Sequence, residues 1–161
     1  MTTTDAEKIG WDIFYSTMSN RHPDWTITPT TDFSNQESQF TQYDVTVIDS
    51  DGENNFIELK ARPEYHITTF PDISIDKHKI DFLVNAVNTD RCRRAYIVGI
   101  YVQDDAMAIW RVKPKHNWKL VKKRWPKKTV LAEGEQKEWI EKWVYELPME
   151  EAKIIETNQD K

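Results

Sequence analysis

Cysteine, glycine and long apolar runs are scarce in this sequence. The one cysteine, Cys92, excludes an internal disulfide framework and a cysteine-rich zinc site. Four glycines exclude collagen-like and glycine-loop classes. The longest uncharged apolar run, from Ala95 to Val102, has eight residues, whereas a membrane-spanning helix needs about 20. The first residues show no basic region followed by an apolar one, so we expect a soluble cytoplasmic protein without a membrane partner.

Aromatic residues, by contrast, are abundant. The chain holds seven Trp, six Tyr and six Phe, a content that argues against global disorder. Its length of 161 residues suits a single domain with one substantial core. We predict a core over residues 1–112, with a basic segment and a C-terminal helix over residues 113–161 packed on it in the same domain.

Charge is distributed unevenly along the chain. The sequence has 22 basic and 27 acidic residues, which gives a formal net charge of −5. Residues 113–128, here called the basic segment, contain eight Lys or Arg and no acidic residue, so 14 basic and all 27 acidic residues lie elsewhere. Such a segment suits contact with a polyanion, and a solvated basic loop is the simpler alternative. The residues expected to contact DNA there are Lys115, Lys119, Lys122, Lys123, Arg124, Lys127 and Lys128.

Periodicity and turn signals predict the secondary structure. Apolar residues at helical spacing indicate a first helix, Ser74 is placed to cap a second, and Trp139 and Trp143 suggest a third. The predicted helices cover residues 5–20, 74–88 and 134–146. The predicted strands cover residues 25–28, 43–48, 56–62, 94–102 and 107–112. This order predicts an α/β fold, a mixed sheet with flanking helices in the sequence helix, three strands, helix, two strands.

One predicted hairpin brings ionisable residues together. The Asp51-Gly52 pair is a strong hairpin signal, and a three-residue loop with a left-handed Gly52 would pair position 49 with position 53. That register places Asp44 directly opposite Glu58, on one face of the sheet. Lys60 lies two residues beyond Glu58 and therefore points to the same face.

This set of side chains suits one kind of chemistry. Two adjacent carboxylates repel unless a cation lies between them or one is protonated. Their oxygen atoms favour Mg²⁺ or Mn²⁺, which keep positions open for water and phosphate. A nearby ammonium can orient a water or stabilise the charge that develops on a phosphoryl group. The alternative is an ordinary ion pair on an exposed strand.

These residues resemble the motif of the PD-(D/E)xK nuclease superfamily, the fold of many restriction endonucleases, RecB-type exonucleases and archaeal Holliday junction resolvases. The resemblance covers roughly residues 5–112 and rests on Asp44, a 13-residue spacer and Glu58-Leu59-Lys60. Tyr43 stands where the family has proline. The resemblance implies that Asp44 and Glu58 bind the divalent metal with the backbone carbonyl of Leu59, and that Lys60 positions the attacking water.

Two further residues are candidates for the same site. Members of the family often add a carboxylate from the first helix, and Glu7 falls on the apolar face of that helix whereas Asp12 lies outside it. A capping box with Thr4 is the alternative explanation for Glu7. Lys79 lies on the apolar face of the second helix, with an aromatic residue three positions later, as in RecB-like nucleases. The alternative is that Lys79 has no role in the site and only packs the aliphatic part of its side chain at the edge of the helix.

The sequence therefore predicts a Mg²⁺- or Mn²⁺-dependent DNA endo- or exonuclease, compact enough to be encoded by a phage or mobile element. One alternative is a catalytically silent nucleic-acid-binding module of the same fold. Another is a protein-interaction module in which the tryptophans of the third helix form the interface, and a homodimer is left open. Within the basic segment, Trp118 and Trp125 are expected to pack onto the domain.

Overall fold

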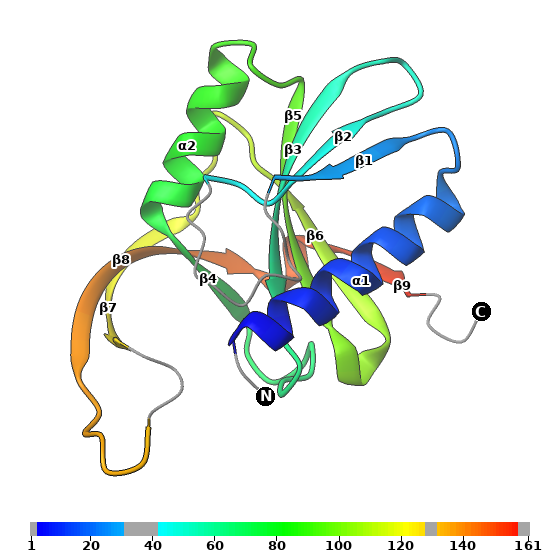
Figure 1. The fold of residues 1–161 in the computed structure, drawn as a ribbon. Coiled ribbons are helices and arrows are strands. Elements are labelled where there is room, and N and C mark those ends of the chain that lie inside the picture. Colours follow the sequence, from blue (N-terminus) through cyan, green and yellow to red (C-terminus); the bar gives the residue numbers. More distant parts are fainter. Residues whose placement is uncertain (1–2, 31–41, 128–131, 158–161) are drawn as a thin grey trace.

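The computed structural model describes residues 3–30, 42–127 and 132–157, and within them the chain is an α/β protein with two sheets (Figure 1). The helices are α1 (Thr3–Arg21) and α2 (Lys77–Asn88). The larger sheet contains, in spatial order, β1 (Thr26–Pro29), β2 (Val45–Ile48), β3 (Asn54–Ala61), β5 (Arg94–Tyr101), β6 (Ala106–Arg111) and β9 (Lys153–Glu156). The smaller sheet contains β4 (Asp72–Asp76), β8 (Trp139–Pro148) and β7 (Lys119–Pro126). Short 3₁₀ turns follow β5 (Val102–Asp104) and β8 (Met149–Glu151).

The larger sheet is mixed. Strands β3 and β5 run parallel, and every other neighbouring pair in this sheet is antiparallel. The parallel pair needs a crossover connection, which β4 and α2 supply. Strand β5 is apolar and buried along nearly its whole length, as the uncharged run in the sequence predicted.

Opposite faces of the larger sheet are covered by different elements. Helix α1 packs Ile13, Phe14 and Met18 against one face. Helix α2 and the smaller sheet cover the other face, where Leu83 lies in the same cluster as Trp110. No helix in the described ranges is long and apolar enough to cross a membrane. The strand β3 runs between the two layers, so α1 and α2 both approach its C-terminal end.

The predicted third helix is wrong, because residues 139–148 form strand β8 in the centre of the smaller sheet. Trp139 and Trp143 are four residues apart, and a spacing of four places residues on one face of a strand as well as on one face of a helix. The many aromatic and β-branched residues of this stretch favour the strand. Much of the basic segment is likewise strand β7 and not a loop.

The predicted cap of the second helix is also wrong. Ser74 lies in the middle of β4, where Ile73 and Ile75 are buried in alternation with more exposed residues. This alternation has the period of a strand, and β4 pairs with β8. Helix α2 therefore begins only at Lys77. The other predicted elements are confirmed to within a few residues, while most of the predicted loop 30–41, Lys128 and the last four residues lie outside the described ranges.

Candidate active site

The turn between β2 and β3 has the predicted geometry. The N–H of Asp49 donates to the carbonyl of Glu53 at 3.0 Å, and Gly52 donates to the carbonyl of Asp49 at 2.9 Å. Gly52 has a φ of +77°, in the left-handed region that favours glycine. Positions 49 and 53 therefore face each other, and the register continues to the pair Val45 and Ile57.

Asp44 departs from the regular register. Its N–H donates to the carbonyl of Ile57 at 3.0 Å, although Ile57 is the register partner of Val45. Two residues of one strand thus face one residue of the other, which is the pattern of a β-bulge. From this position the Asp44 side chain reaches past Glu58, and its carboxylate accepts the N–H of Leu59 at 2.8 Å. The prediction that Asp44 lies directly opposite Glu58 is corrected by this shift.

Glu58 lies on the face of β3 that α2 covers. It is 3% exposed, and both of its carboxylate oxygens contact Lys79 Nζ, at 3.3 and 3.2 Å. The same two elements meet again two residues earlier on the strand, where Phe56 stacks with Phe82. A step of two along β3 is thus matched by a step of three along α2, so the packing of Phe82 positions Lys79 over Glu58.

The environment of Glu58 strongly favours its neutral form. Burial, followed by the negative charge of Asp44, raises the pKa of Glu58 from 4.5 to about 8. The cations Lys79 and Lys60 lower this pKa, but by less than burial and Asp44 raise it. A buried carboxylate with a second carboxylate beside it is a group that an additional cation would stabilise in its charged form.

Helix α1 contributes Glu7 to the same cluster. Gly10 lies one helical turn further on and lets the helix approach β3 closely, because a Cβ there would lie 3.1 Å from Ala61 Cβ. Glu7 is exposed, so its predicted place on the core-facing side of the helix is corrected. Partial desolvation and the charge of Asp44 nevertheless raise its pKa, while Lys60 and Lys79 lower it. Asp12 is exposed and pairs with Lys8 at 3.1 Å, so the structure brings Glu7 and not Asp12 to the cluster.

The donor atoms of this cluster fit a magnesium ion. In a strand, the N–H and C=O of one residue lie on the same edge, so the Leu59 carbonyl lies on the edge that Asp44 occupies. Asp44, Glu58 and this carbonyl give three oxygen donors. Among the described residues, no group of three or more His, Cys, Asp or Glu side chains is placed to hold a metal. Magnesium does not require one, since it usually binds one or two carboxylates together with water and substrate phosphate.

The basic segment differs from its prediction in charge as well as in structure. Three of its lysines pair with glutamates of the adjoining chain: Lys122 with Glu141 at 2.8 Å, Lys127 with Glu138 at 3.4 Å, and Lys123 with Glu146 at 3.9 Å. These glutamates lie in β8 or directly before it. The predicted third helix did not place them next to the lysines. The segment is therefore less positive than its sequence suggests, and its exposed cations without a glutamate ion pair include Lys115, Lys119 and Arg124 among the described residues.

The tryptophans divide into two groups. Trp118 is buried in the core, as expected, and its Nε1 donates to Glu151 at 3.3 Å, while Trp125 is half-buried. Trp139 and Trp143 are instead 44% and 51% exposed on β8. The sequence analysis offered both as an interface in one alternative only and assigned them to a helix, and the content of aromatic and β-branched residues was the missed signal of a strand.

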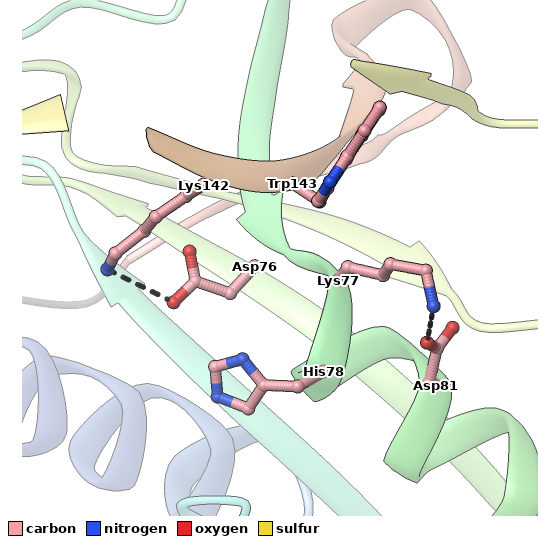
Figure 2. Close-up of a pocket in the computed structure, with 6 residues that line it drawn as sticks. All are labelled: Asp76, Lys77, His78, Asp81, Lys142 and Trp143. Carbon is pink, nitrogen blue, oxygen red and sulfur yellow. Dashed lines mark hydrogen bonds and ion pairs between the residues drawn. The ribbon is translucent and has the colours of Figure 1, made fainter. Parts of the chain in front are cut away.

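A small pocket lies beside the helix that carries Lys79. It has a volume of about 330 Å³ and lies between the first turn of α2 and β8 (Figure 2). Lys142 pairs with Asp76 at 3.5 Å across it, and Lys77 pairs with Asp81 along the helix. His78 and Trp143 complete the lining. Lys79 follows His78 directly, so one helical turn serves both the pocket and the carboxylate cluster.

Comparisons of the chain with protein-family models, with curated proteins and with solved structures find no match. Any functional assignment is therefore argued from the geometry of the chain itself.

Proposed function

We propose that the protein is a metal-dependent deoxyribonuclease of the PD-(D/E)xK superfamily. The observation that carries the proposal is the meeting of Glu7, Asp44, Glu58, Lys60 and Lys79 around the end of β3, since these five residues come from α1, the β2–β3 hairpin and α2. The order of α1, three strands, α2 and two further strands in one sheet also supports it, with β4 as an addition.

Each residue has a role that its surroundings suit. Asp44, Glu58 and the Leu59 carbonyl would hold a Mg²⁺ or Mn²⁺ ion. Such an ion supplies Lewis-acid polarisation of a phosphodiester and a bound water of lowered pKa. Lys60, whose charge reaches both Glu7 and Glu58, would orient the attacking water. Lys79 would hold the Glu58 carboxylate in place. Glu7, on the solvent side of the cluster, would accept a proton or bind the cluster through a water molecule.

A silent binding module of the same fold is the second candidate. The observation that favours it is the contact of Lys79 Nζ with both oxygens of Glu58, because an ammonium there gives the carboxylate a partner without a metal. The two candidates differ in one respect. In the nuclease a divalent ion would bind beside this pair and stabilise the fold, whereas the silent module would gain no stability from the ion.

The test is a cleavage assay on duplex, single-stranded, flapped and branched DNA with Mg²⁺, with Mn²⁺ and with EDTA. We expect metal-dependent cleavage of at least one substrate by the wild type and none by Asp44→Asn or Glu58→Gln. Asp51→Asn, at the exposed tip of the same hairpin, and Asp12→Asn, on the outer face of α1, are the matched controls and should cleave normally. A wild type that cleaves none of these substrates and shows no metal-dependent melting shift would contradict the proposal.

A further inference from the structure

Strands β7 and β8 present two exposed tryptophans on one face. Trp139 and Trp143 are 44% and 51% exposed, and their spacing of four residues places both indoles on the same face, about 13 Å apart along the strand. Figure 1 shows this antiparallel pair extending away from the larger sheet beyond α2. Neither indole belongs to the buried clusters of the fold.

Each of these indoles has a cation against it. Arg124 and Lys137 lie 4.8 and 4.7 Å from the ring centre of Trp139, and Lys122 lies 6.0 Å from that of Trp143. These cations lie over the rings, so a base would stack by displacing one of them to the side, where it can contact the phosphate. Stacked bases with cations at the backbone are the combination by which proteins hold unpaired nucleotides. Every base has a stacking face, so such contacts tolerate any sequence.

The charge of this face favours an unpaired strand over a duplex. Glu141 lies between the two tryptophans on β8 and pairs with Lys122 at 2.8 Å. Binding to a duplex depends on free cations that contact its phosphates. An acidic residue on the surface therefore disfavours duplex binding. Stacking on an indole is affected much less by a neighbouring ion pair.

The inner tryptophan leads toward the candidate active site. Trp143 lines the pocket that His78 and Lys142 border, and Lys79, the next residue on α2, contacts Glu58 at 3.2 Å (Figure 2). A strand stacked on Trp139 and then Trp143 would therefore arrive at the helical turn that holds Glu58.

We propose that this face of the β7–β8 pair is a stacking platform for unpaired nucleotides, and that the substrate of the protein is single-stranded DNA or DNA with a single-stranded tail. The substrate part of this inference rests on the proposed nuclease function, whereas the binding part does not.

The test measures binding in EDTA, where no cleavage occurs, by fluorescence anisotropy of a labelled 20-nucleotide oligo(dT) and of a blunt duplex of the same length. We expect the wild type to bind oligo(dT) more tightly than the duplex. Trp139→Ala and Trp143→Ala should each weaken oligo(dT) binding about tenfold, and Trp143→Phe should lose less because a ring remains. The dependence on salt should stay unchanged, since neither substitution removes a charge.

Tyr15→Ala is the matched control, because Tyr15 is 47% exposed on α1, away from β7 and β8. It should bind as the wild type does, and thermal melting should show all variants folded. Equal oligo(dT) binding by wild type and both alanine variants, or tighter binding of the duplex, would overturn the inference and leave a protein partner as the occupant of the face. Cleavage by the wild type with no effect of the tryptophans on binding overturns this inference alone. Tryptophan-dependent binding without cleavage overturns the nuclease function alone.

Discussion

The carboxylate of Asp44 accepts a hydrogen bond from the backbone N–H of Leu59 at 2.8 Å. One side chain thus links the beginning of β2 to the residue between Glu58 and Lys60. Asp44 precedes the last regular pair of the hairpin, Val45 with Ile57, and its side chain extends beyond that pair to Leu59. Asp44 therefore has a structural contact in addition to its candidate role as a metal ligand.

This contact predicts that two substitutions of Asp44 will differ in stability but not in activity. Asp44→Asn keeps an oxygen that can accept the Leu59 N–H, whereas Asp44→Ala removes it and should cost about 1 kcal/mol relative to Asn. Both should abolish metal-dependent cleavage, because both remove the charged ligand. Urea unfolding and the cleavage assay measure the two effects, with Asp51→Asn as the control in the same hairpin. Full activity of Asp44→Asn would argue against Asp44 as a ligand.

Glu58 should make the stability of the metal-free protein depend on pH. Its pKa is about 8 in the folded state and near 4.5 when unfolded. The folded state therefore binds the proton more tightly, so the stabilisation is fully present below pH 4.5 and is lost as pH rises through 8. The loss should reach several kcal/mol, at about 1.4 kcal/mol per pKa unit. Urea unfolding in EDTA from pH 5 to 9 tests this, and Glu58→Gln should flatten the curve.

Lys79 should protect the fold mainly at high pH. Lys79→Met removes the cation that lowers the pKa of Glu58, so the pH-dependent loss should extend above pH 8. Below about pH 6 Glu58 is neutral with or without Lys79, and the substitution should cost little. Above pH 9 an ionised Glu58 without its partner should cost about 3–5 kcal/mol. The control is Lys77→Met, whose pairing with Asp81 lies on the surface and should contribute little to stability at any pH.

The candidate site was more predictable from the sequence than the periphery of the fold. The Asp51-Gly52 turn determines the register of the hairpin through local backbone geometry, and that register brings Asp44 close to the Glu58 end of β3. The position of Lys79 followed from the apolar face of its helix, because an ionisable residue there must meet a partner. The exposure of Glu7 and the irregular backbone at Asp44 escaped prediction.

The smaller sheet could not be predicted in the same way. Its strands come from residues 72–76, 119–126 and 139–148, so the pairing joins segments far apart in the chain. A spacing of four between Trp139 and Trp143 is compatible with either a helix or a strand, and the tertiary pairing of β8 with β4 decides between them. The pairing of β8 with β7 brings Glu138, Glu141 and Glu146 beside lysines in and directly after β7, which is why the predicted excess of positive charge is reduced.

Gly10 should be required for the placement of Glu7. A Cβ at position 10 would lie 3.1 Å from Ala61 Cβ and 3.4 Å from Ile100 Cδ1. The Ile100 methyl can turn aside, but Ala61 Cβ moves only with the strand. Gly10→Ala gains about 1 kcal/mol of helix propensity and loses about 1–3 kcal/mol to the crowding. We expect net stability to fall relative to Ser16→Ala, an exposed control in the same helix, and cleavage to fall further as α1 moves from β3. Higher stability with full activity would contradict this.

Metal binding should release a proton, and this distinguishes a site at Glu58 from binding elsewhere. Without metal Glu58 is mostly protonated at pH 7, because its pKa is about 8, and a carboxylate ligand must lose that proton to coordinate. The melting shift caused by a fixed Mg²⁺ concentration should therefore grow between pH 6.5 and 8.5. Calorimetric heats of binding at pH 7 should depend on the ionisation enthalpy of the buffer, because the released proton is taken up by the buffer. In Glu58→Gln both effects should disappear, whereas Glu150→Gln, an exposed control, should keep them. A wild-type shift that is the same at both pH values would show that the ion binds without Glu58.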